Sequence, residues 1–232
     1  MRSHKLFVVA LAGLVAAACM YLGTGLNPIW WMLWLAPIPV LAIAPRLRGS
    51  TVFLLGSVVL LIGETNQWNY VWHYLELPAQ IAVLYFLVPA VVFGFCVRFT
   101  RRFLQRGSLF LATVAFPVYW VTYEYLTAVI SPHSTWGNLA YTQMDCLPLI
   151  QIASITGLWG ISFVVFLFAS GGAALLSGEG NPGQRRLLAV TVGLIICAVF
   201  VFGKWRLQSN PSQSVAVTLI AKDVPMSVLS RL

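Results

Sequence analysis

The residues whose types could do chemistry gather in two short stretches of the chain, residues 64–76 and residues 131–145. In the second stretch, Ser131, His133 and Asp145 are the three residue types of a hydrolase triad, in which a serine attacks an acyl carbon. Triad geometry comes from the fold, and closeness along the chain is no evidence for it. We therefore assign no catalytic residue in this chain.

Metal and cofactor chemistry also lack a matching pattern. His73, Glu76, His133 and Asp145 are possible metal ligands, but their spacing matches no known ligand pattern. The chain has no Walker or Rossmann glycine loop that would hold nucleotide phosphates. The sequence therefore predicts neither a metal site nor a cofactor.

The cysteines show no C-x-x-C spacing, and they are Cys19, Cys96, Cys146 and Cys197. Three of them fall in strongly apolar runs, where cysteine behaves as a small apolar side chain. Cys146 is predicted to lie at the outer interface, but no activating base lies near it in sequence. The pattern does not favour a nucleophilic thiol.

Glu124 is the ionisable residue inside an otherwise uncharged run, residues 107–130. Such a residue is costly in a membrane span and usually faces protein or a water-filled cavity. Two interpretations remain open: a carboxyl group that is hydrogen-bonded between helices, or a functional group in a cavity.

The first stretch, residues 64–76, is aromatic and polar at once and includes Trp68 and Tyr70. Tryptophan and tyrosine are enriched at membrane–water interfaces, so the stretch is consistent with an ordinary aromatic belt. The alternative is a site for a lipid headgroup or acyl chain at the mouth of a cavity.

The composition shows what must position these residues. Of the 232 residues, 59% are hydrophobic and 9% are charged, whereas a soluble domain is roughly 45–50% apolar and about a quarter charged. Disordered chains are poor in apolar residues, which excludes disorder. The chain is therefore predicted to be an integral membrane protein.

Uncharged runs separate the charged segments, and in a bilayer such runs are expected to be helices. We predict an all-α polytopic bundle of about seven transmembrane helices. The predicted spans are residues 6–23, 29–45, 49–63, 77–97, 107–130, 158–177 and 187–203, with 146–156 approaching along the interface. Kinks are expected at Pro37, Pro39, Pro89 and Pro117.

The basic residues predict the orientation of the bundle. With a cytoplasmic N-terminus, ten of the 14 Lys and Arg residues fall in inner segments: Arg2, Lys5, Arg46, Arg48, Arg98, Arg101, Arg102, Arg106, Arg185 and Arg186. With seven crossings, this predicts a cytoplasmic N-terminus and an extracytoplasmic C-terminus. The basic residues are spread over short loops, so no nucleic-acid partner is expected.

The pattern Trp120-x3-Glu124-x11-Trp136-x4-Tyr141-x-Gln143 resembles the membrane region of bacterial apolipoprotein N-acyltransferases. Residues 148–153 and 157–163 resemble its continuation, and 68–71 and 27–37 resemble earlier parts of it. The candidate lipid- or substrate-binding residues are Trp68, Tyr70, Glu124, Trp136, Tyr141 and Gln143. The chain departs from the family pattern at Thr127, where the family has Arg, and at 133–135.

The resemblance implies a bacterial cytoplasmic (inner) membrane protein. It also implies transfer of an acyl chain, at the outer face of that membrane, from a phospholipid to the N-terminal cysteine amine of a diacylated lipoprotein. In that family the helices hold the lipid, and a nitrilase-like domain with Cys, Glu and Lys carries the chemistry through a thioester. The partners that the resemblance implies are membrane phospholipid and diacylated lipoproteins.

The tail of the sequence sets one further expectation. Residues 1–204 are predicted to form the transmembrane domain, and 205–232 a linker with the orphan first strand of a truncated nitrilase-like domain. A lone strand is not stable in water. We therefore expect this chain to be catalytically incomplete by itself. The alternative is a lipid-binding or scaffolding subunit for a separate nitrilase-like chain.

Overall fold

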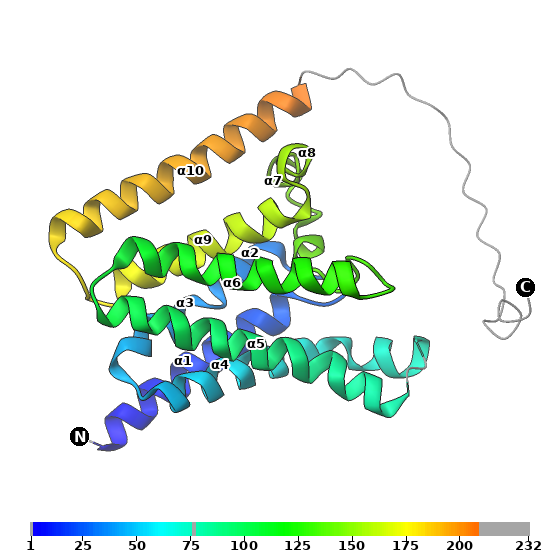
Figure 1. Ribbon diagram of the computed structural model, residues 1–232, viewed down its shortest axis with the longest axis horizontal. Coiled ribbons are helices and arrows are strands. Elements are labelled where there is room, and N and C mark those ends of the chain that lie inside the picture. Colours follow the sequence, from blue (N-terminus) through cyan, green and yellow to red (C-terminus); the bar gives the residue numbers. More distant parts are fainter. Residues whose placement is uncertain (1, 76–77, 209–232) are drawn as a thin grey trace, which may run out of the picture.

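The computed structural model describes residues 2–75 and 78–208, and these residues form a layered bundle of helices (Figure 1). The long helices are α1 (Arg2–Gly23), α4 (Gly49–Glu64), α5 (Ala79–Gln105), α6 (Leu109–Ile130), α9 (Leu158–Leu176) and α10 (Pro182–Gln208). The short helices are α2 (Trp30–Leu35), α3 (Ile38–Ile43), α7 (Leu147–Ile150) and α8 (Ala153–Thr156). Single turns are η1 (Ala44–Arg46), η2 (Thr65–Gln67), η3 (Tyr70–Tyr74) and η4 (Leu139–Gln143).

The fold confirms an all-α membrane protein. Six helices in the described part are long and apolar enough to cross a bilayer. The described residues contain no strand. Residues 209–232, which make up most of the predicted linker and orphan-strand segment, lie outside the described residues.

The second predicted span differs from a continuous helix, because residues 29–45 form α2, α3 and η1 in succession. Pro37 and Pro39 lack the N–H group that an unbroken helix needs, which explains the interruption. The broken segment still runs from one end of the bundle to the other. Near its start the carbonyl of Trp30 accepts from Gln143, and near its end the carbonyl of Pro45 accepts from Gln105.

The segment before α9 is separate from the crossing helix, as the sequence predicts; its position along the interface stays a prediction. Short helices α7 and α8 precede Gly157, whose φ of +65° suits a glycine and ends this approach. The crossing helix α9 then begins at Leu158.

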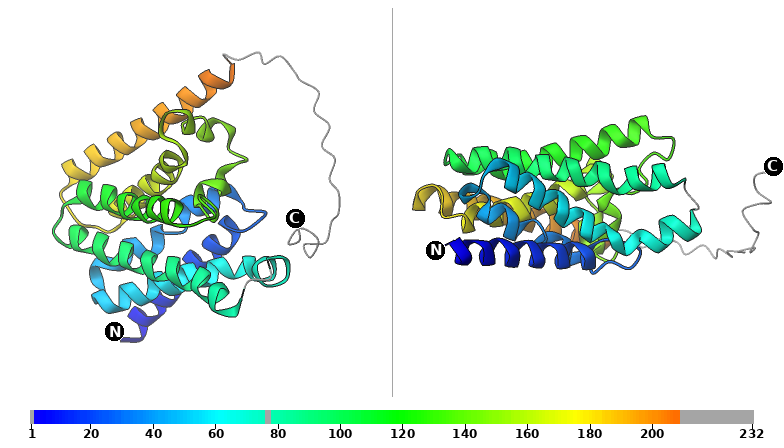
Figure 2. Two further views of the ribbon diagram at one scale, coloured as in Figure 1. Left: turned by 45° about the vertical axis from the view of Figure 1, so that its right-hand side comes forward. Right: turned by 90° about the horizontal axis from the view of Figure 1, so that it is seen from below.

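The arginine-containing turns and the aromatic loops lie at opposite ends of the bundle (Figure 1, Figure 2). At the first end, Arg46 donates to the carbonyl of Ser177 over 3.0 Å, and Arg101 donates to that of Leu47 over 2.8 Å. These bonds close the ends of neighbouring helices where their carbonyl groups have no partner within the helix. The aromatic loops at the other end carry the candidate site residues.

The helices between the two ends pack closely against one another. Helices α4 and α5 cross where a Cβ on Gly94 would lie only 2.6 Å from the carbonyl oxygen of Phe53. Only glycine permits that approach, as at other interfaces of membrane helices. Behind this crossing, Phe93, Phe116 and Phe166 pack edge to face with ring centroids 5.3 Å apart in each adjoining pair. α9 supplies Phe166 and is the most buried of the six long helices.

Candidate functional site

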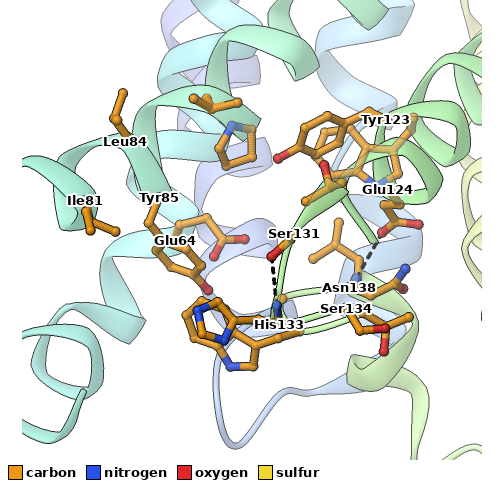
Figure 3. Close-up of a pocket in the computed structure, with 18 residues that line it drawn as sticks. Glu64, Ile81, Leu84, Tyr85, Tyr123, Glu124, Ser131, His133, Ser134 and Asn138 are labelled. Carbon is orange, nitrogen blue, oxygen red and sulfur yellow. Dashed lines mark hydrogen bonds between the residues drawn. The ribbon is translucent and has the colours of Figure 1, made fainter. Parts of the chain in front are cut away.

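A cavity of about 310 Å³ lies at the aromatic end of the bundle, between α4, α5, α6 and the loop after α6 (Figure 3). Its walls combine apolar, aromatic and polar side chains. The lining residues are Glu64, Ile81, Leu84, Tyr85, Val88, Pro89, Trp120, Tyr123, Glu124, Thr127, Ser131, His133, Ser134, Thr135, Trp136, Gly137, Asn138 and Leu139. Of the sequence-predicted site residues, the cavity brings together Glu124 and Trp136.

Glu124 enters the cavity wall from α6 and is 6% exposed. Its Oε1 accepts a 3.0 Å hydrogen bond from the backbone N–H of Leu139. Its Oε2 is buried near Trp120 and Asn138 without a hydrogen bond of regular geometry. Glu124 is therefore compatible with both interpretations. Its carboxyl group is hydrogen-bonded to the loop, and it also lines a cavity.

The loop that carries the remaining polar residues is shaped locally. The side chain of Asn138 accepts from the backbone N–H of Ala140 over 2.8 Å and so begins η4. Gly137 has a φ of +80°, a conformation that suits glycine. From α9, Ser162 donates to the same Asn138 oxygen over 3.3 Å. These contacts fix the position at which Leu139 meets Glu124.

A second carboxyl group, Glu64, faces the cavity from the opposite side (Figure 3). It is the last residue of α4 and is 7% exposed. Gln67 donates to its Oε2, and the hydroxyl of Tyr85 donates to Gln67 over 3.1 Å. From the sequence, Glu64 is only one residue of an outer polar and aromatic stretch, and this role is not predicted. The available signal was its position, directly between an apolar run and an aromatic one.

Aromatic side chains form the mouth of the cavity. Trp136, which is 40% exposed, stacks on Tyr85 with ring centroids 4.8 Å apart. The ring of His133 meets Trp136 edge-on at 6.1 Å. This stack fastens the loop after α6 to α5 and places one imidazole at the mouth.

The structure places Trp68 and Tyr70 outside the lining of this cavity. Trp68 stacks between Trp72 and Phe86, with ring centroids 5.6 Å away in both cases. Tyr70 stacks on Tyr74 at 6.2 Å along the π-helical turn η3. Their arrangement has the character of an aromatic belt beside the site.

Tyr141 and Gln143 support the loop and do not line the cavity. The hydroxyl groups of Tyr141 and Thr135 lie 2.7 Å apart, within hydrogen-bonding distance. Gln143 is fully buried; it accepts from the indole N–H of Trp34 over 2.8 Å and donates to the carbonyl of Trp30 over 3.1 Å. Gln143 thus joins η4 to α2.

The arrangement suits binding of an amphiphile. The cavity offers an apolar wall, two carboxyl groups and an imidazole, and no Lys or Arg is among the described lining residues. Within the described residues no group of three or more His, Cys, Asp or Glu is placed to hold a metal ion. Glu76, one of the possible ligands considered above, lies outside those residues. Burial raises the pKa of the Cys146 thiol, which disfavours the nucleophilic thiolate.

Comparison of the sequence with known proteins shows the family of this chain. Residues 11–171 match the model of the apolipoprotein N-acyltransferase N-terminal domain. An apolipoprotein N-acyltransferase of Geobacter metallireducens is 34% identical over 69% of this chain and 32% of its own length. One of Treponema denticola is 31% identical over 65% and 27%, and one of Coxiella burnetii 30% identical over 70% and 34%. The chain thus spans about a third of the length of these relatives.

Proposed function

This chain belongs to the apolipoprotein N-acyltransferase family, and we propose that its helices hold the phospholipid acyl donor for N-acylation of lipoproteins. The observation that carries the proposal is the cavity between α5 and α6, which has an apolar side wall and a polar, aromatic mouth. Its volume lies at the lower end of the range of about 300–1,000 Å³ that is typical of small-molecule sites.

The apolar wall supports entry of the lipid from the side. Ile81, Leu84 and Val88 lie along α5, line the cavity and are each about half exposed. In a bilayer the exposed part of such side chains faces hydrocarbon. An acyl chain therefore has an apolar route from the membrane to the cavity, past these three residues.

The polar mouth would hold the glycerol and headgroup end of the lipid. Glu64 and Glu124 face each other across it, and His133 lies beside Trp136. A phospholipid whose chain lies against α5 would place its glycerol and headgroup at this level. Acyl chain and headgroup would thus be held together, which fixes the ester carbonyl between them.

The proposal gives these helices binding and positioning roles. Acyl transfer takes place on a cysteine of a nitrilase-like domain. Its thiolate attacks the ester carbonyl of the phospholipid, releases a lysophospholipid and becomes a thioester. The N-terminal amine of a diacylated lipoprotein then attacks the thioester, forms an amide and releases the thiol. The raised pKa of Cys146 supports assigning this chemistry to another thiol.

The proposed location is the bacterial cytoplasmic membrane, with the N-terminus in the cytoplasm and the cavity mouth at the outer face. The distribution of arginine supports this orientation, because the arginine-containing turns lie at the end opposite the cavity. Positively charged loops are retained on the cytoplasmic side.

Photolabelling tests the proposal. The purified chain is reconstituted with a phospholipid that carries a photoreactive group in its acyl chain, and labelled residues are identified by mass spectrometry. We expect labelling of Leu84, Val88 and Tyr123, and its loss when Leu84→Trp fills the cavity. Leu111→Trp, at another exposed leucine in a span, is the matched control. Equal labelling of all lipid-facing helices, or equal loss in both variants, would contradict the proposal.

A further inference from the structure

A second polar region lies at the opposite end of the bundle, where α5 passes the start of α4. The guanidinium groups of Arg98 and Arg101 converge there on Gly49. Arg98 Nε lies 3.6 Å and Arg101 Nη1 3.7 Å from the position that a Cβ on Gly49 would occupy. Two full positive charges therefore lie close to the same short stretch of backbone.

These charges have no acidic partner within the described part of the chain, where Arg98 and Arg101 form no ion pair. Arg101 donates through Nε to the carbonyls of Ala44 and Leu47 at 3.2 and 2.8 Å, so its position is fixed. Arg98 forms no hydrogen bond to the described residues and is half-buried. Arg102 lies close enough to add to the repulsion felt by Arg101. The region carries an excess of positive charge.

The start of α4 adds to this positive potential. Its first residue is Gly49, and the N-cap residue Arg48 forms no side-chain cap. The first turn contains no acidic residue. The N–H groups of a first helical turn have no partner within the helix and carry the positive end of its dipole. The same spot thus combines the fixed guanidinium group of Arg101, the uncompensated charge of Arg98 and free backbone donors, a combination that suits a phosphate.

An apolar surface continues from the arginines into the membrane-spanning part of the bundle. Phe95 stacks on Phe99 with ring centroids 5.9 Å apart, and Phe53 of α4 lies 4.8 Å from Phe95. Phe95 is 41% exposed, so this surface faces lipid. A ligand that contacts both the arginines and this apolar surface needs an anionic head and an apolar tail.

We propose that Arg98, Arg101 and the N-terminus of α4 bind the phosphate of an anionic phospholipid. Its acyl chain lies along Phe53, Phe95 and Phe99. Basic pockets between transmembrane helices are suited to such headgroups. The site is separate from the acyl-donor cavity, so it does not depend on the proposed function.

The test measures lipid binding to the full chain in detergent by native mass spectrometry. The probes are phosphatidylglycerol, zwitterionic phosphatidylcholine and inorganic phosphate. We expect preferential binding of phosphatidylglycerol and about fivefold weaker binding in Arg98→Gln, since a basic residue near an anionic surface contributes about that factor. Arg98→Lys should keep most of the affinity.

Arg186→Gln is the matched control, because Arg186 is an exposed arginine near the start of α10 at the same end and the charge change is identical. Its affinity for phosphatidylglycerol should stay within twofold of the parent chain. Thermal unfolding checks that Arg98→Gln is folded. Equal losses in the two glutamine variants, equal binding of phosphatidylcholine, or displacement of the lipid by inorganic phosphate would overturn the proposal.

Discussion

The indole N–H of Trp34 donates a 2.8 Å hydrogen bond to the side-chain oxygen of Gln143, joining the broken second span to the turn that follows the cavity loop. Both side chains are buried. The amide group of Gln143 also donates to the carbonyl of Trp30 and to the hydroxyl of Thr142. One amide thus satisfies polar atoms from two separate parts of the chain.

Replacing Gln143 by leucine should destabilise the fold. The substitution leaves the indole N–H of Trp34 buried without an acceptor, and each such loss costs about 1–3 kcal/mol. We expect a lower temperature of unfolding in detergent, followed by tryptophan fluorescence. Gln151→Leu is the control, because Gln151 bonds only its own helical turn at a more exposed place. Equal effects in the two variants would argue against the role of Gln143.

Glu124 should hold the cavity loop through one oxygen. Glu124→Gln keeps an acceptor for the N–H of Leu139, whereas Glu124→Ala removes it. Faster amide hydrogen exchange across residues 138–143 is therefore expected in the alanine variant alone. Thr122→Ala, an exposed change on α6 two residues away, should leave the exchange unchanged. Unchanged exchange in Glu124→Ala would show that other contacts are sufficient to hold the loop.

The sequence predicted the bundle because the apolar runs and the charges between them are properties of composition. It also singled out Glu124, since an acid within a span is conspicuous without any structure. The inward direction of Glu64 could not be predicted, because the sequence does not show whether a residue at a helix end turns toward the bundle. The full burial of Gln143 depends on contact with Trp34, more than a hundred residues earlier. Such pairings arise from packing and leave no local pattern.

The pKa of the Cys146 thiol should lie above the usual value for cysteine. Burial raises its pKa, so at a given pH it carries less thiolate than a free cysteine with a pKa of about 8.5. Because the thiolate is the reactive form, alkylation of Cys146 should be slower than that of a cysteine peptide and should keep rising at higher pH. Mass spectrometry of the alkylated chain at several pH values measures this. A reaction profile identical to that of the free peptide would contradict the raised pKa.

The stack of Trp136 on Tyr85 should keep the cavity mouth in place. An aromatic pair contributes about 0.5–1.5 kcal/mol beyond the area it buries, and this pair joins the loop after α6 to α5. Trp136→Ala should therefore weaken photolabelling of Leu84 and Val88 by the lipid probe, by a factor of about 2–10 when that energy is lost from binding. Trp136→Phe should restore most of the labelling, because a ring remains to stack.

Trp31→Ala serves as the control for this change, since Trp31 is an exposed tryptophan at the same end that is not part of the cavity wall. Its labelling pattern should match that of the parent chain. If Trp136→Ala and Trp31→Ala lower the labelling equally, the effect belongs to the aromatic belt as a whole. If neither lowers it, the lipid reaches α5 without help from the mouth, and the stack serves only to hold the loop.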